Sequence, residues 1–231
     1  MSASLVGSEM CIRDRFWGIW IAFYINITCG LALISQEKDI LHDVLRAFPQ
    51  YANLSPAKFA AAISGIIGLV LAVDSVFNTA GRVGFSTLSD HLKRRETVYQ
   101  VIFIMSIAVC LLQIFTNSIG NALLWAVLAM LFLVNAGYGG GFSTLPVLLD
   151  QHFGTKTVST THGLTLSAWA FAGLSGNQLA SFVVAHAPDQ AHRYAALIPV
   201  LTGLFVVALI SISLVKYLGG RNVTKAVEDR G

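Results

Sequence analysis

The sequence predicts an all-α integral membrane protein with six transmembrane helices. The chain has 231 residues, of which 55% are hydrophobic and only 12% are charged, whereas a soluble domain carries about 25% charged residues. Its apolar residues gather into six long runs, each close to the ~20 residues needed to cross a bilayer. A soluble core is excluded, because six runs of this length would leave no polar faces for water.

The six expected spans follow one another along most of the chain. The fourth and fifth are long enough to tilt within the membrane or to extend beyond it. Residues 36–58 join the first two spans and are expected to form either a plain loop or a short surface helix. The expected bounds of the spans are, in chain order, 16–35, 59–80, 98–116, 121–149, 160–185 and 195–217.

The two ends of the chain differ from these apolar runs. Residues 1–15 contain no apolar stretch long enough for a signal peptide. They resemble translated adapter sequence from sequencing, and a native cytoplasmic tail is the alternative. Residues 219–231 are charged and are expected to form a disordered cytoplasmic tail.

Positive charge is distributed unevenly between the two sides of the membrane. Eleven Lys and Arg residues fall on the side of the two termini and four on the other side. Because cytoplasmic loops carry the excess of positive charge, both termini are expected in the cytoplasm, with the chain in the plasma or inner membrane. This topological role also explains the net charge of +3, so a nucleic-acid partner is not expected.

An acid and an arginine lie at membrane depth in and just after the second expected span. Asp74, Asn78 and Arg82 are spaced four residues apart, which places them along one face of a helix. A charge within a membrane helix costs about 2.5–3.5 kcal/mol on insertion scales, so such residues usually face a protein interior or a cavity. For Asp74 two roles stay open, a carrier of a coupling proton or a buried acid paired with another helix.

Two stretches resemble a known transporter family. Residues 78–95 read N-T-A-G-R-V-G-F-S-T-L-S-D-H-L-K-R-R. They resemble the N-x-x-G-R-x-x-x-G-x-x-S-D-x-x-G-R pattern between the eighth and ninth helices of the major facilitator superfamily, except that Ser86 and Lys93 replace glycines. Residues 137–176, which begin G-Y-G-G-G-F-S-T-L-P, are similar to the tenth and eleventh helices of the oxalate-formate antiporter family.

The resemblance covers nearly all of residues 16–218 and implies a fold. It implies that the six helices are the C-terminal half of a twelve-helix transporter, arranged as two inverted three-helix repeats. A missing N-terminal six-helix half, or a second copy of the chain, would then complete the protein. Together with the unusual residues 1–15, the chain is expected to be a fragment.

Two groups of residues are expected to take part in movement. An aspartate at a helix end followed by cations can pair with neighbouring helix termini and hold a gate closed; an ordinary positive loop is the alternative. A hinge is predicted where glycines permit close helix approach and a proline removes a backbone hydrogen bond, with tight packing as the alternative. The gate residues are Gly81, Ser89, Asp90, Arg94 and Arg95, and the hinge residues are Gly139, Gly140, Gly141 and Pro146.

The resemblance also implies a central site for a small organic anion, held by one cation on the eighth helix and one on the eleventh. Arg82 matches the eighth-helix arginine, and a guanidinium can bind a carboxylate through two hydrogen bonds; a gate or boundary residue is its alternative role. Trp169 stands where the oxalate transporter has its eleventh-helix lysine, so a single cation beside an aromatic wall favours a monocarboxylate. Further candidates for substrate binding are Tyr24, Asn26 and Tyr138, each of which has an interhelical hydrogen bond as its alternative role.

The expected function is therefore transport of an organic anion by alternating access. No cofactor or metal is expected, because the histidines show no metal-ligand spacing. A membrane scaffold or receptor without transport activity is the main alternative. An intramembrane enzyme is a weaker alternative, since Ser175 within G-L-S-G is its only suggestive feature.

Overall fold

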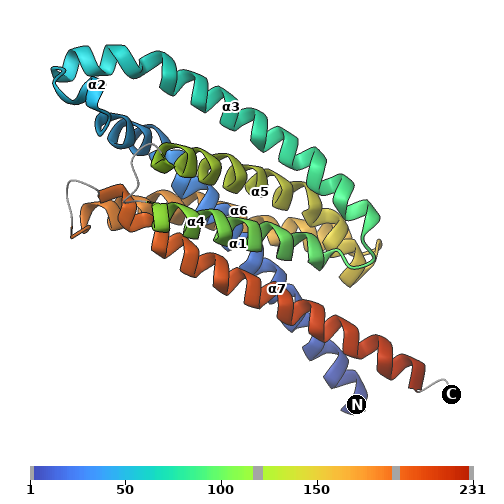
Figure 1. Cartoon of the computed structure of the whole chain (residues 1–231). Coiled ribbons are helices and arrows are strands. Elements are labelled where there is room, and N and C mark those ends of the chain that lie inside the picture. The colour runs from blue at the N-terminus through green and yellow to red at the C-terminus, as the bar shows by residue number, and fades with distance from the viewer. Residues whose placement is uncertain (1–2, 117–121, 189–192, 229–231) are drawn as a thin grey trace.

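The structure is a computed structural model that describes residues 3–116, 122–188 and 193–228. Within these residues the chain forms seven α-helices and one short 3-10 helix at Arg193–Ala196, with no strand (Figure 1). The α-helices are α1 (Ala3–Arg46), α2 (Pro49–Ala52), α3 (Pro56–His91), α4 (Glu96–Thr116), α5 (Ala122–Phe153), α6 (Val158–Ala185) and α7 (Leu197–Glu228).

Local sequence explains where the long helices begin and end. Pro56 occupies the first turn of α3 after the extended Ser55, a position where its missing N–H is not needed. After α5, Gly154 has a φ of 81°, a conformation that side chains with a Cβ rarely adopt. Its N–H donates to the Asp150 carbonyl over 2.8 Å and so caps the end of α5.

Five helical segments are long and apolar enough to cross a membrane. Four lie in α1, α3, α4 and α5, and the fifth is Tyr194–Gly219, which includes most of α7. The remaining expected span, the fifth (160–185), forms α6, but its apolar stretch is weaker than those of the other five. It contains no charged residue, yet serine, threonine, glycine, asparagine and glutamine interrupt its apolar residues. The described part of the chain is therefore all-helical and has the long apolar helices of a multi-pass membrane protein, and α6 is the one long helix without an apolar stretch of that length.

Several helices extend beyond the expected spans. α1 begins at Ala3 and continues to Arg46, through most of the expected loop, because Ile40, Leu41 and Leu45 are buried and no proline occurs before Pro49. The only helix confined to the 36–58 connection is the four-residue α2. α7 continues to Glu228, so residues 219–228 are helical rather than disordered; residues 229–231 lie outside the described part.

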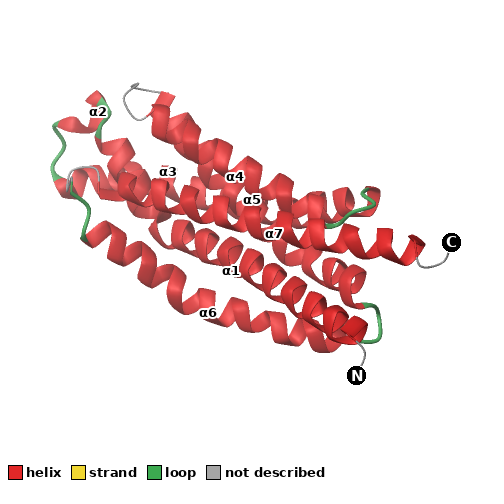
Figure 2. Ribbon diagram, turned by 90° about the horizontal axis from the view of Figure 1, so that it is seen from below, coloured by secondary structure: helices red, strands yellow, loops and turns green. Residues whose placement is uncertain are grey.

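The long helices form two layers. α3, α5, α1 and α6 lie side by side in this order, since α3 packs on α5, α5 on α1, and α1 on α6. α4 packs against α5 and α7, and α7 packs against α1, which places α4 and α7 together on one side of the first layer, against its two middle helices (Figures 1 and 2). The other side of the first layer is left without a covering helix in the described part of the chain.

The packing is the same for the two halves of the chain. If α1, α3 and α4 are exchanged with α5, α6 and α7, the contact of α3 with α5 becomes that of α6 with α1, and α4 with α5 becomes α7 with α1. The pairs α1–α5 and α4–α7 map onto themselves. Successive long helices run in opposite directions (Figure 1), so the second three-helix unit runs opposite to the first.

Close approach of backbones holds the first layer together. A Cβ at Gly81 of α3 would collide with the backbone carbonyl of Ala136, and one at Gly139 of α5 would collide with the carbonyl of Asn78. At the α1–α6 contact, a Cβ at Gly176 would lie 2.9 Å from the Thr28 carbonyl oxygen. Small residues permit this separation, which is the usual basis of helix association in membranes.

Gly81→Ala is expected to destabilise the fold by about 1–3 kcal/mol, the typical cost of overpacking a well-packed interface. The measurement is the midpoint of thermal denaturation in detergent, followed by tryptophan fluorescence. Gly84→Ala is the matched control on the same helix, because no atom lies within 4 Å of the position of its added Cβ. Equal midpoints for the two variants would show that the α3–α5 approach is looser than described.

Candidate functional site

Arg82 lies on the uncovered side of the first layer, flanked by aromatic rings. Its Nε donates to the Asn78 Oδ1 over 3.2 Å, and its Cζ lies 5.4 Å from the centroid of the Phe142 ring on α5. This distance is within the range of a cation–π interaction. The Phe142 ring in turn meets Trp169 of α6 edge to face, with 6.0 Å between their centroids.

Tyr138 completes this group, which we call the Arg82 cluster (Arg82, Tyr138, Phe142 and Trp169). The Tyr138 side chain interacts with both the Arg82 guanidinium and the Trp169 side chain, while its ring packs against Gly30 of α1. Trp169 is 48% exposed, so the cluster is open to the uncovered side. The structure thus brings together three predicted residues and adds Phe142, which the sequence analysis missed.

Tyr24 belongs to a neighbouring contact between α1 and α6. Its ring stacks on Trp20 with 5.3 Å between centroids, and its hydroxyl donates to the Ser175 Oγ over 2.8 Å. The Trp20 Nε1 donates to the Ser167 Oγ over 3.0 Å. These bonds join the two helices next to the Arg82 cluster, and they also engage Ser175, the residue that suggested an enzyme.

Asn26 does not join the Arg82 cluster. Its side chain is only 2% exposed, donates to the Gly137 carbonyl over 3.4 Å and lies against Gly141. The structure therefore places it in the α1–α5 interface, as an interhelical hydrogen bond. The distinction depends on which face of α1 meets α5, and sequence alone does not supply this register.

Asp74 is connected to Arg82 by a chain of hydrogen bonds, which we call the asparagine relay (Asp74, Asn135, Asn78 and Arg82). The Asn135 Nδ2 of α5 donates to the Asp74 carboxylate. The Asn78 Nδ2 donates to the Asn135 Oδ1 over 2.9 Å, and Arg82 donates to the Asn78 Oδ1. A carboxylate only accepts and a guanidinium only donates, so both ends fix the amide orientations and every donated hydrogen points from Arg82 towards Asp74.

The predicted hinge glycines are tightly packed in this conformation. A Cβ at Gly140 would meet the Phe85 ring of α3, and one at Gly141 would meet the Asn26 amide. α5 is a single helix from Ala122 to Phe153 with Pro146 inside it. Packing therefore accounts for the glycines here, and the hinge stays a prediction.

Four of the predicted gate residues lie around the connection between α3 and α4, and the fifth, Gly81, lies in the α3–α5 contact described above. Asp90 has 72% side-chain exposure and lies 3.6 Å from Arg95, while Arg95 also donates to the Ser89 Oγ over 3.2 Å. Arg94 extends further, because it bonds to Glu96 over 3.0 Å and to the Lys216 carbonyl of α7. Arg94 therefore joins different helices, whereas Asp90, in the last turn of α3, pairs with Arg95 in the connection that follows.

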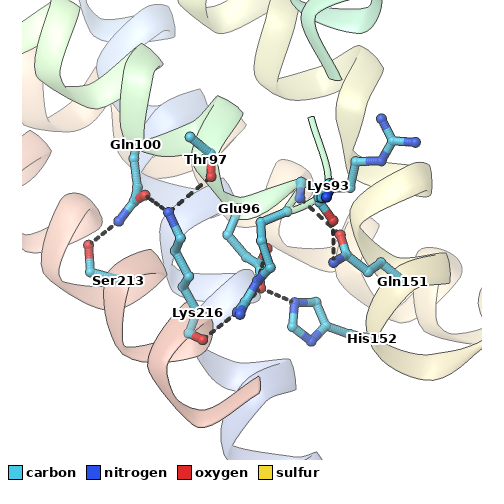
Figure 3. A network of polar contacts seen from close by, with 10 residues as sticks. Lys93, Glu96, Thr97, Gln100, Gln151, His152, Ser213 and Lys216 are labelled. Carbon is cyan, nitrogen blue, oxygen red and sulfur yellow. Dashed lines mark hydrogen bonds and ion pairs between the residues drawn. The ribbon is translucent and has the colours of Figure 1, made fainter. Parts of the chain in front are cut away.

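Glu96, at the start of α4, is the central carboxylate of this network (Figure 3). Its side chain is 1% exposed, and its Oε1 lies 3.1 Å from the His152 Nε2 near the end of α5. The Lys216 Nζ donates to Gln100 over 2.7 Å and to Thr97 over 3.0 Å. The network thus ties the end of α5 and the C-terminal half of α7 to the start of α4.

The sequence analysis missed Glu96, His152 and Lys216 as members of this network. Glu96 directly follows the three cations and lies two residues before the third expected span, and this position was the signal that the sequence offered. Its partners come from helices that are distant along the chain, so their contact depends on the fold.

Glu96→Gln is expected to destabilise the fold by about 1–3 kcal/mol, because a buried partner of a charged hydrogen bond is lost. Asp90→Asn should cost only about 0–1 kcal/mol, as is usual for an exposed ion pair. The midpoints of thermal denaturation in detergent compare the two variants. A larger loss for Asp90→Asn would contradict the assignment of Glu96 as the central acid.

Comparison with known proteins supports a transporter rather than an enzyme. No family model matches the chain. The chain is 24% identical over 220 residues to the oxalate:formate antiporter of Oxalobacter formigenes, a match that covers 95% of this chain and 47% of the relative. The chain thus spans about half the length of this curated relative, which is a transporter, in agreement with the expectation that the chain is not an enzyme.

Proposed function

We propose that the chain is one six-helix half of a secondary transporter that moves a small organic anion by alternating access. The observation that carries this proposal is the Arg82 cluster, in which a cation lies on the uncovered side of the helix layer between aromatic rings. The antiporter relative and the apolar helices support the transporter class. A guanidinium at such a place is suited to bind a carboxylate.

The arrangement of the helices supports a half-transporter of the major facilitator type. The two three-helix units pack in the same way and run in opposite directions, as inverted repeats do. Both outer helices of the first layer expose large apolar side chains, such as Val83 of α3 at 66% and Leu174 of α6 at 73%. A missing N-terminal half, or a second copy of the chain, would cover this layer and enclose the Arg82 cluster, while lipid would surround the rest.

The composition of the cluster favours a monocarboxylate. Asn78 engages the Nε of Arg82, which orients the guanidinium and directs its two terminal amino groups as a fork for one carboxylate. Phe142 and Trp169 supply aromatic surface beside it. A second cation, which would bind the second carboxylate of oxalate, is replaced by Trp169 on α6.

The gate and the coupling site complete the proposed mechanism. The network around Glu96 ties α4, α5 and α7 together at one end of the bundle, and we place that end in the cytoplasm of a plasma or inner membrane. Its contacts would stabilise one state of the transporter, while the α5 glycines and Pro146 would allow a change of helix packing. Asp74 would carry a coupling proton.

The test is anion binding to the purified chain in lipid nanodiscs, with tryptophan fluorescence as the readout because Trp169 lies in the cluster. The probes are formate, acetate, lactate and oxalate. Arg82→Gln should weaken binding by about 30-fold or more, since loss of one partner of a charged pair costs at least about 2 kcal/mol. Tighter binding of oxalate than of the monocarboxylates would contradict the proposed substrate class.

Lys58→Gln is the matched control. It removes one cation from the same helix, but Lys58 is exposed near the start of α3, far along the helix from Arg82. The Lys58→Gln variant should bind the four anions with the same affinity as the unaltered chain. Native-like binding by the Arg82→Gln variant would overturn the proposed anion site.

A further inference from the structure

Glu37 is a second buried acid that interacts with Asp74. It lies on α1 and is 2% exposed, while Asp74 on α3 is 4% exposed. The helices that carry them, α1 and α3, pack against each other, and the charge of Asp74 acts on Glu37. Among the described residues, the Glu37 Oε1 and the Asp74 Oδ1 are both buried and have no hydrogen-bond partner.

No cation forms an ion pair with either carboxyl group in the described part of the chain. On α1, Lys38 and Asp39 are exposed, and His42 lies against the Phe59 ring with 4.8 Å between centroids. On α3, Lys58 is exposed at the helix start, and Arg82 reaches Asp74 only through the asparagine relay. From α5, the group that faces Asp74 is the neutral amide of Asn135.

Two buried carboxylates without a paired cation are a costly arrangement. Burial disfavours each negative charge, and each charge disfavours the other. A single proton relieves both effects, because two like-charged groups at a shared site bind one proton more readily than either group alone. The protonated carboxyl also supplies an O–H donor, which the two unpartnered oxygens lack.

We propose that Glu37 and Asp74 form a carboxyl pair that holds one proton, and that the asparagine relay couples the charge of this pair to Arg82. The coupling, but not the pair itself, rests on the proposed anion transport. When the pair loses its proton, its second negative charge acts through the relay and competes with an anion for Arg82. When the proton is bound, Arg82 is available to the anion, so proton and anion are carried together.

Infrared spectroscopy of the chain in lipid nanodiscs tests the pair without any anion. The readout is the C=O stretching band of a buried protonated carboxyl group, followed from mildly acidic to mildly alkaline pH. The band of the unaltered chain should persist to higher pH than that of Glu37→Gln or of Asp74→Asn, since each variant leaves one buried acid without its like-charged neighbour. Asp39→Asn, which alters an exposed acid on α1, should leave the band unchanged.

The infrared experiment can fail or succeed independently of the proposed anion site, because no anion is present. Absence of the band from the unaltered chain, or its persistence to the same pH in either single variant, overturns the pair, because the proton would then be missing or held by one acid without the influence of the other. Neither result bears on anion binding by Arg82. Circular dichroism of each variant confirms that loss of the band is not loss of the helical fold.

The coupling is tested by anion binding at two pH values, with acetate as the probe. Acetate should bind about tenfold more tightly at mildly acidic pH than at mildly alkaline pH, a typical coupling between two sites. The Glu37→Gln, Asp74→Asn double variant should bind acetate equally at both pH values. A pH dependence that persists in the double variant overturns the coupling, whereas an absence of acetate binding in every form is a failure of the proposed anion site.

Discussion

The close contact of α3 with α5 is the constraint on which the rest of the site depends. At Gly81 and Gly139 no side-chain atom separates the two helices, so polar groups on each can bond to the other directly. This separation lets Asn135 reach both Asp74 and Asn78. It also places Phe142 beside the Arg82 guanidinium. Packing of the smallest residues therefore sets the geometry of the most polar ones.

Charged side chains at the end of the bundle pair with each other directly, whereas those at its centre are connected through neutral side chains. At the end, the carboxylate of Glu96 meets Arg94 and His152 directly, and direct pairing offsets much of the cost of burial. At the centre, Asp74 and Arg82 are joined only through two neutral amides. A direct ion pair would neutralise Arg82, whereas the relay leaves the guanidinium on the uncovered side of the layer. The indirect connection is thus suited to a cation that has to meet a ligand.

The sequence alone was sufficient to predict an all-helical membrane fold and to identify polar residues that share one face of a single helix. The stripe of Asp74, Asn78 and Arg82 is a matter of helical period and could be predicted, as could most of the apolar spans. Asn135, Phe142 and Glu37 could not, because their importance comes from contacts between helices, and the rotation of one helix against another is fixed by packing. The length of α1 was underestimated for a related reason: beyond Ser35 charged residues such as Lys38 and Asp39 interrupt the buried apolar residues, so the helix lacks the continuous apolar run of a span.

The symmetry of the packing explains why Arg82 and Trp169 face the same site. α3 and α6 are equivalent helices in the two three-helix units, and they run in opposite directions. Arg82 lies nine residues before the end of α3 and Trp169 eleven residues after the start of α6, so the opposite directions of the two helices bring both residues to a similar depth. Phe142, on α5 between them, contacts both side chains. The two outer helices thus carry a cation on one side of the site and an aromatic ring on the other, and in the proposed transporter this difference would favour one carboxylate rather than two.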